Sequence, residues 1–421
     1  MGSSERIKEA VVITPSDPTP FRNLPLSAID SQLFLRFTIE YLLIYKPRSA
    51  DGGVAAVARV KAALAKALVP YYPLAGRVRA KPDGSGLEVV CRAQGAVFIE
   101  AFSDRTVGEF DRAPKFVTQW RKLLSVHLTL LKDGGVALGV GFNHCICDGI
   151  GSAEFLNLFA ELASAGGRRV AAEFKPKPVW DRHLLTRQKL VKPPLSLPVF
   201  NSVPDVSGFV TRFSAERLAP TSISFDRSAL SELKNLASSR LSQSSSFTSF
   251  EVLSAHIWRS WARALNLPSN QVLKLLFSVN FRNRVKQSLP AGYYGNAFVL
   301  GCAQSSAKDL AEKGLWHAAA LVKAAKERVG EEYVRAVVES VSESRACPDS
   351  VGVLILSQWS RLGLERVDFG LGRPVHVGPI CSDRYCLFLP VFDQREAVKV
   401  MVAVPASAVD KYEYLVRTPY S

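Results

Sequence analysis

Residues Asn143–Gly149, with the sequence NHCICDG, combine side chains that could carry out acid–base chemistry. The imidazole of His144 exchanges protons near neutral pH, which makes this residue a candidate general base. Asp148 follows four residues later, where its carboxylate could cap a helix or pair with another group. The structural alternative is a histidine in an ordinary turn followed by a helix-capping aspartate, and the motif alone favours that alternative.

Two predicted elements position this turn. The apolar run Val136–Phe142 indicates a buried strand that stops just before His144. After Gly149, apolar residues recur at roughly helical spacing, namely Ile150, Phe155, Leu156, Phe159 and Leu162. His144 is therefore expected on a strand-to-helix turn, where side chains can meet a ligand.

The composition is that of a folded protein. The chain has 421 residues, 48% of them hydrophobic and 22% charged, which excludes disorder and allows two ordinary domains or one large α/β unit. No apolar run reaches the ~18 residues that span a bilayer. The N-terminus lacks the apolar core of a signal peptide. We therefore expect a cytoplasmic protein without a membrane span.

Charge and cysteine content bear on the possible partners. The formal net charge of +15 suits nucleic acid, a phosphorylated small molecule or simply a solvated surface. Lys and Arg are dispersed, with no basic helix and no RNA-binding aromatic motif, so we expect no nucleic acid partner. The 7 cysteines show no zinc-like spacing, and one residue separates Cys145 from Cys147. We therefore expect no metal site and reduced thiols.

Hydrophobic periodicity predicts helices and strands that alternate through both halves of the chain, an α/β pattern. Helices are expected at 54–69, 150–165, 227–240, 248–265 and 306–329. Strands are expected at 86–91, 122–131, 136–142, 221–225, 273–279, 297–302, 352–357, 384–389 and 397–404.

A proline-rich stretch suggests the domain boundary. Proline is densest between Lys175 and Pro198, and it continues neither a helix nor a central strand. We therefore expect an N-terminal domain at 1–185 that carries the His144 motif, a crossover linker at 186–215 and a C-terminal domain at 216–421. Part of 365–395 could pack with the N-terminal domain.

A predicted helix start in the second half carries hydroxyl groups. Thr248 and Ser249 lie near the beginning of the expected helix, and Ser254 lies one turn further on. Hydroxyls and free backbone amides at a helix N-terminus could hold a phosphate. Ordinary helix capping is the alternative, and the pattern alone favours it.

Two further clusters follow predicted strands. Arg282 and Arg284 are two residues apart on a segment expected to be extended, so their side chains should point the same way. A guanidinium there could form an ion pair with a carboxylate such as Asp148. The alternative is that both are solvated surface arginines. Ser357 and Trp359 lie on one alternating face and can both donate a hydrogen bond. There the alternative is a tryptophan that fills the core beside an incidental serine.

Taken together, five ordered motifs over nearly the whole chain resemble those of the plant BAHD acyltransferases, which transfer acyl groups from coenzyme A thioesters. The matching segments are Leu26–Asp30 (LSAID), Tyr71–Arg77 (YYPLAGR), His144–Asp148 (HCICD), Gly292–Asn296 (GYYGN) and Asp368–Gly372 (DFGLG). Two positions depart from the family pattern. Leu371 replaces a tryptophan in the last motif, and Asn280 replaces an aspartate before the two arginines.

The resemblance implies a fold of two chloramphenicol-acetyltransferase-like α/β domains with mixed sheets, joined by a long crossover loop, with an active-site channel at their interface. It also implies His144 as general base, with Ser357 and Trp359 as donors to the oxyanion. Asp148 would be a structural residue paired with Arg282. The motif around Asp368, Gly370 and Gly372 would be structural, and Thr248, Ser249, Ser254 and Gly149 would lie near the coenzyme.

The implied reaction uses acyl-CoA as a co-substrate and no permanently bound cofactor. Within it we expect an aromatic acyl group, hydroxycinnamoyl or benzoyl, and a hydroxylated plant metabolite as acceptor. An amine acceptor and a non-catalytic binding protein of the same family are the alternatives. Since one chain holds both expected domains, we also expect a monomer.

Overall fold

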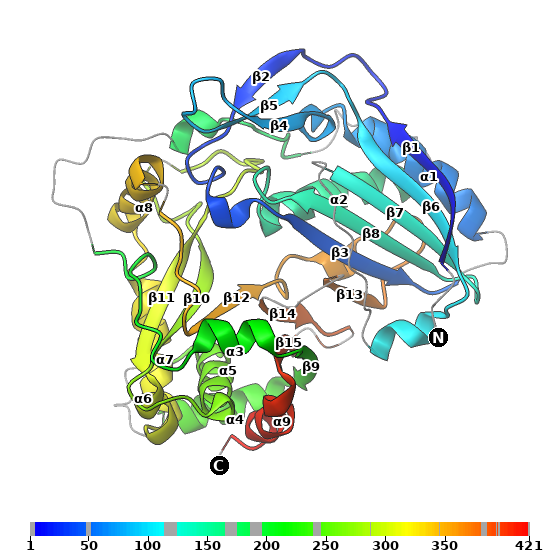
Figure 1. Ribbon diagram of the computed structural model, residues 1–421. Helices are drawn as coiled ribbons and strands as arrows, with labels where there is room; N and C mark the ends of the chain where they lie inside the picture. The colour runs from blue at the N-terminus through cyan, green and yellow to red at the C-terminus, as the bar shows by residue number, and fades with distance from the viewer. Residues whose placement is uncertain are drawn as a thin grey trace. The chain divides into compact units, whose positions relative to one another are not determined.

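The computed structural model divides into two compact units (Figure 1). The first holds residues 1–187, 288–297 and 361–381, and the second holds 188–287, 298–360 and 382–421. The structure describes residues 5–47, 52–112, 124–164, 175–185, 196–238, 246–286, 288–344, 346–379, 385–392, 394 and 396–419.

The first unit is built on a six-stranded mixed sheet in the order β1-β6-β7-β8-β3-β13, in which only the β6–β7 pair is parallel among the described residues. Its strands are β1 (Glu5–Ile13), β3 (Thr38–Tyr45), β6 (Ala96–Ser103), β7 (Leu124–Leu131), β8 (Val136–Asn143) and β13 (His376–Pro379). A smaller sheet contains β2 (Arg22–Pro25), β5 (Leu87–Cys91) and β4 (Arg77–Ala80).

The helices of this unit are α1 (Gly52–Ala67) and α2 (Gly149–Ser164), which pack against each other. Aromatic rings join α2 to the sheet. The ring of Phe155 lies 5.6 Å from that of Phe142 on β8, which lies 5.8 Å from that of Tyr41 on β3. This buried contact fixes the strand and the helix that flank the His144 turn.

The second unit is built on another six-stranded mixed sheet, in the order β11-β10-β12-β14-β15-β9. Its strands are β9 (Leu218–Phe225), β10 (Val272–Asn280), β11 (Phe298–Ser306), β12 (Val353–Gln358), β14 (Cys386–Pro390) and β15 (Val398–Pro405). Its helices are α3 (Phe209–Ala215), α4 (Arg227–Ser238), α5 (Ser249–Leu265), α6 (Ala307–Glu312), α7 (Leu315–Glu327), α8 (Glu331–Ser344) and α9 (Val409–Arg417).

The expected α/β class with mixed sheets is confirmed, and so is each predicted strand to within a few residues. One predicted helix is wrong in extent. The helix expected at 306–329 is two helices, α6 and α7, because Gly314 has an extended backbone (φ −64°, ψ 167°) and caps the second one.

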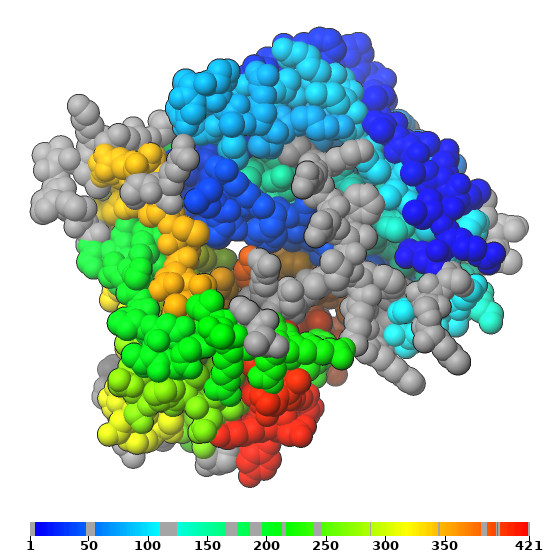
Figure 2. Space-filling model, viewed as in Figure 1, coloured from blue at the N-terminus to red at the C-terminus, as the bar shows by residue number. Residues whose placement is uncertain are grey.

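Several elements escaped prediction for physical reasons. β3 and β6 are almost entirely buried, so they lack the two-residue alternation of a half-buried strand. β1 is an edge strand with a largely exposed sequence, and its residues lie at the surface of the first unit in Figure 2. α8 is rich in valine, which is a modest helix former.

The crossover is more structured than a linker. Its described part, 196–215, ends in α3 and packs within the second unit. The buried Lys274 donates a hydrogen bond to the carbonyl oxygen of Pro198 (3.0 Å), and Gln271 donates one to that of Pro204 (3.1 Å). Residues 186–195 lie outside the described residues.

Two segments of the second half of the chain belong to the first unit. Residues 361–381 include β13, which pairs with β3. Residues 288–297 also belong there, although the sequence predicts them in the C-terminal domain. The reason is local pairing, since Tyr293 forms a parallel bridge with Val179 and the side chain of Asn296 binds Asp30. In the described part of the chain, no helix has the length and apolar character needed to cross a bilayer.

Candidate active site

His144 lies directly after β8, at the turn that leads into α2. Its backbone amide donates to the carbonyl oxygen of Phe37 (2.9 Å), and its ring lies edge-on to the Phe37 ring at 5.2 Å. The side chain is half-buried. The turn is thus attached to the chain that enters β3, which holds the imidazole in a defined place.

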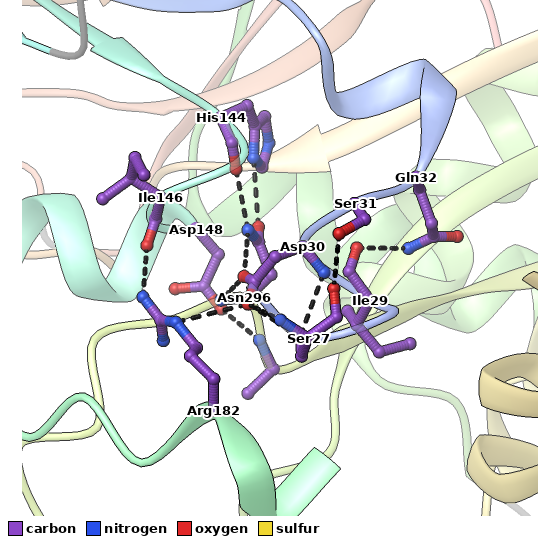
Figure 3. Close-up of polar contacts among 11 residues, drawn as sticks. Ser27, Ile29, Asp30, Ser31, Gln32, His144, Ile146, Asp148, Arg182 and Asn296 are labelled. Atoms are coloured by element: carbon purple, nitrogen blue, oxygen red, sulfur yellow. Dashed lines mark hydrogen bonds and ion pairs between the residues drawn. The ribbon is translucent and has the colours of Figure 1, made fainter. Parts of the chain in front are cut away.

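Asn296 is a polar partner of the imidazole, as Figure 3 shows. Its side-chain oxygen lies 3.1 Å from Nδ1 of His144, and its Nδ2 donates to the carbonyl oxygen of His144 (2.7 Å). Nδ2 also donates to Oδ1 of Asp30 (2.8 Å). Asn296 and Asp30 are both completely buried, so the contacts behind the half-buried imidazole are shielded from solvent.

Asp30 is held in turn by Arg182, a buried arginine on a short 3-10 helix (Arg182–Leu185). Nε of Arg182 lies 3.2 Å from Oδ2 of Asp30, and its Nη2 donates to the carbonyl oxygen of Ile146 (2.6 Å). The guanidinium also lies 4.3 Å from the centre of the Trp180 ring. The arginine therefore connects the Asp30 turn with the His144 turn.

The electrostatic surroundings of His144 favour the neutral ring. Burial lowers the pKa of His144 below its ordinary value, while the hydrogen bond with its own backbone, the charges of Asp148 and Asp30 and the hydrogen bond that Asn296 accepts act in the opposite direction. A neutral imidazole at physiological pH can accept a proton, as a general base must.

Asp148 caps α2 and also binds a second segment. Its Oδ1 accepts hydrogen bonds from the amides of Ile150 (3.1 Å) and Gly151 (3.0 Å), and its Oδ2 accepts one from the amide of Ala297 (3.0 Å). The residue Asp148 is 5% exposed, so these contacts are well shielded from water. Arg282 belongs to the second unit, and its pairing with Asp148 stays a prediction.

Two glycines let the segment 292–296 approach this turn closely. A side chain at Gly151 would place Cβ 2.0 Å from the carbonyl oxygen of Tyr294, and one at Gly295 would place it 1.4 Å from Nη1 of Arg182. Gly149, which is predicted to lie near the coenzyme, is less crowded, since the three atoms nearest to its Cβ would all belong to the Leu362 side chain, the first at 3.1 Å. Contact within the protein is therefore the reason for glycine at 151.

The DFGLG segment forms a tight turn in the first unit. Oδ1 of Asp368 accepts hydrogen bonds from the amides of Gly370 and Gly372, both at 2.8 Å, and both glycines have positive φ (79° and 86°). Phe369 is completely buried, and its ring lies 4.8 Å from that of Phe159. Leu371 is also buried, so an apolar residue suits that position.

The other predicted site residues belong to the second unit. Ser357 is on β12, and Trp359 follows it with its backbone amide bonded to the carbonyl oxygen of Phe388 (2.8 Å). Asn280 ends β10 and accepts a hydrogen bond from the backbone amide of Arg282 (3.0 Å). The roles of Ser357, Trp359 and Arg282 stay predictions.

The start of α5 favours the capping alternative. The hydroxyl of Thr248 accepts from the amide of Glu251 (3.3 Å), and the Glu251 carboxylate accepts from the amide of Thr248 (2.8 Å). Ser249 is half-buried, whereas Ser254 is completely buried, which counts against direct contact with a ligand from solvent. Coenzyme binding by these residues stays a prediction.

Cys145 in the His144 turn does not have the properties of a nucleophile. Cys145 and Cys147 are both buried, and burial raises the pKa of the Cys145 thiol to about 12. A thiol with so high a pKa stays protonated near neutral pH. Over the described ranges, no three His, Cys, Asp or Glu side chains lie close enough to hold a metal ion.

Sequence reasoning assigned no separate role to the three residues that support His144. Asp30 and Asn296 each end one of the motifs that carry the family resemblance, so a signal for them existed. Arg182 lies in the proline-rich stretch and belongs to no motif. Only the folded chain brings its guanidinium to Asp30.

Comparison with known proteins gives consistent matches along the chain. Residues 6–415 match the family model described as the Transferase family. The chain is 32% identical over 427 residues to omega-hydroxypalmitate O-feruloyl transferase of Arabidopsis thaliana, covering 96% of this chain and 91% of that protein. It is 33% identical over 432 residues to benzyl alcohol O-benzoyltransferase of Petunia hybrida, covering 97% and 92%.

A solved structure shares the fold. The crystal structure of F. sporotrichioides TRI101 complexed with coenzyme A and T-2 matches with a TM-score of 0.77 at 17% identity, covering 93% of this chain and 97% of that one. At this identity the likeness shows the fold alone. It confirms the expected architecture of two chloramphenicol-acetyltransferase-like domains.

Proposed function

Because this chain belongs to the Transferase family, that of the BAHD acyltransferases, and so transfers acyl groups, we propose that it moves an aromatic acyl group from coenzyme A to a hydroxyl group. The observation that carries the proposal is the buried network around His144, in which Asn296 binds Nδ1 at 3.1 Å. The relatives named above support the substrate class, since their names specify feruloyl and benzoyl transfer to oxygen.

In the proposed reaction, the imidazole of His144 takes the proton from the acceptor hydroxyl as its oxygen attacks the thioester carbonyl carbon. A tetrahedral intermediate forms, and its oxyanion needs donors that are already in place. The loss of one such donor typically costs ~100- to 1000-fold in rate. We assign this role to the Ser357 hydroxyl and the Trp359 indole, which are both able to donate.

When the intermediate collapses, the carbon–sulfur bond breaks and the imidazolium returns its proton to the coenzyme A thiolate. The products are the ester and free coenzyme A, and His144 is neutral again. The chemistry requires no acyl-enzyme, which agrees with the buried, protonated Cys145. The cytosolic location and the monomeric state stay predictions.

The test is acceptor-dependent release of the free thiol. Purified protein would receive feruloyl-, benzoyl- and acetyl-CoA, each with an alcohol pool and separately with an amine pool. His144→Ala is expected to abolish release while the protein stays folded, whereas the control His317→Ala, on α7 in the second unit, is expected to retain release.

The outcomes separate the alternatives. Release from the aromatic thioesters with alcohols supports the proposal. Release only with amines indicates an N-acyltransferase, and release only from acetyl-CoA contradicts the aromatic donor. If coenzyme A raises the melting temperature but nothing is released, the chain is a binding protein of this family.

A further inference from the structure

Phe37 is an aromatic residue beside the candidate base. The centre of its ring lies 5.2 Å from that of the His144 imidazole, and the two ring planes make an angle of 63°. Both residues are only half-buried, so each keeps part of its surface exposed. A molecule that reaches the exposed part of the imidazole therefore also comes close to the phenyl ring.

The register of the first sheet makes these two residues neighbours. Thr38 begins β3 and pairs with Asn143, the last residue of β8. Phe37 and His144 are the residues just outside this pair, and the amide of His144 donates to the carbonyl oxygen of Phe37 (2.9 Å). The amide of Phe37 donates to the carbonyl oxygen of Leu35, which is buried. The ring is thus attached to a rigid element, and selection between substrates requires such support.

The position of Phe37 points to the acceptor rather than to coenzyme A. The proposed function assigns the thioester carbonyl to donors of the second unit, Ser357 and Trp359, whereas Phe37 and the base His144 belong to the first unit. A general base works within ~3 Å of the oxygen whose proton it takes. The carbon atoms that carry the acceptor hydroxyl then come within reach of the adjoining ring.

Two negative charges also act on the imidazole. Burial lowers the pKa of His144, whereas the charges of Asp148 and Asp30 act in the opposite direction. Asp30 pairs with Arg182, but the hydrogen bonds of Asp148 described above come from backbone amides, which carry no net charge. Like charges repel more strongly in a partly buried site than in water. These surroundings disfavour a carboxylate beside the reacting hydroxyl.

We propose that Phe37 is a specificity-determining residue, and that the acceptor is a neutral alcohol whose hydroxyl is carried by an aromatic or similarly apolar group. This inference rests on the proposed function and deepens it, since it names the kind of hydroxyl compound that meets His144. A phenyl ring offers a large apolar surface and a favoured edge-to-face geometry toward other rings. A hydroxy acid with its carboxylate next to the hydroxyl is a poor acceptor.

The experiment compares kcat/KM within two matched pairs of alcohols, with one aromatic acyl-CoA as donor and thiol release as the readout. Benzyl alcohol and ethanol differ by a phenyl ring, and we expect a preference of about 100-fold for benzyl alcohol, the order that burial of such a ring supplies. In mandelate a carboxylate replaces the methyl group of 1-phenylethanol. We expect 1-phenylethanol to be preferred by more than about 10-fold.

Variants of Phe37 test whether this residue causes the preference. Phe37→Ala is expected to lower the preference for benzyl alcohol over ethanol by about 10-fold through a raised KM for benzyl alcohol, with the KM for acyl-CoA changed less than about 2-fold. Phe37→Leu keeps an apolar side chain for packing but no ring, and should lower the preference by about 3-fold. Phe37→Tyr keeps the ring and should keep the preference.

The matched control is Phe102→Ala on β6, which removes a phenyl ring that is 39% exposed. Phe102 pairs with Leu130, which pairs with Val136, the first residue of β8. It therefore lies at the other end of the sheet from His144. The preference for benzyl alcohol should be unchanged in this variant.

The failures are distinguishable. Thiol release with an unchanged preference in both Phe37→Ala and Phe37→Leu overturns the inference and leaves the proposed function intact. Equal use of mandelate and 1-phenylethanol does the same. Release from none of the alcohols overturns the proposed function and the inference with it. A preference that falls in Phe37→Ala but not in Phe37→Tyr or Phe102→Ala supports the assignment.

Discussion

The starts of α2 and α5 show the same local device with different consequences. Asp148 caps α2 and Thr248 caps α5. In each case a side-chain oxygen accepts a hydrogen bond from a backbone amide of the first helical turn. The second oxygen of Asp148 also binds the amide of Ala297, next to Asn296. At α5 the Thr248 hydroxyl and the Glu251 carboxylate cap each other's backbone, and Glu251 pairs with Lys326.

This difference separates a structural cap from a cap that organises a site. In the first unit the capping carboxylate connects two turns that are about 150 residues apart in sequence, one with His144 and one with Asn296. In the second unit the capping box serves mainly the helix itself. We therefore expect damage at α2 to affect both stability and rate, and damage at α5 to affect stability alone.

The largest effect is expected from Asp148→Ala. It leaves the amides of Gly151 and Ala297 buried without their acceptor, which should lower the free energy of unfolding by about 4 kcal/mol and reduce kcat as well. Chemical denaturation and the thiol-release assay measure the two effects. The control Asp83→Ala loses only an exposed bond to Ser85. A fully stable but slow Asp148→Ala would show a direct catalytic role instead.

Gly151→Ala should have the next largest effect. Its Cβ would lie 2.0 Å from the carbonyl oxygen of Tyr294, so the segment that carries Asn296 must move, at a cost of about 3 kcal/mol in unfolding free energy. Gly149→Ala, whose Cβ would have the flexible Leu362 side chain as its nearest neighbour, should cost less than about 1 kcal/mol. Equal stability of the two variants would mean that the close approach at 151 is unimportant.

Thr248→Ala should have a smaller effect, and only the stability of the protein should change. Loss of one N-cap hydroxyl costs about 1 kcal/mol, measured by chemical denaturation, and kcat should be unchanged. A rise in the KM for acyl-CoA at unchanged stability would contradict the contrast between the two helix starts. It would instead support the phosphate-binding alternative for Thr248.

The smallest change is expected from pH above neutrality. The base must be unprotonated, and burial lowers the pKa of His144 below its ordinary value near 6.5. His144 is then already neutral at pH 7, so kcat/KM should change less than about 2-fold from pH 7 to 8.5 and should fall as the pH drops through the lowered pKa. A tenfold rise between pH 7 and 8 would require a raised pKa and would exclude this account.

Much of the fold follows from local pattern. The strand before His144 and the helix after it are read directly from an apolar run and a helical spacing, since burial on one side imposes that periodicity. The buried β3 and the exposed edge strand β1 are missed because neither is buried on one side only, so neither carries that periodicity.

The sequence by itself determined the α/β class, the family and the candidate base, because these depend on residue types and on spacing within short segments. Only the tertiary structure decided what supports that base. Asp30, Arg182 and Asn296 come from three separate segments, and their hydrogen bonds form only when 292–296 joins the first unit. A buried polar group requires a partner, but its own segment does not specify which distant atom supplies it.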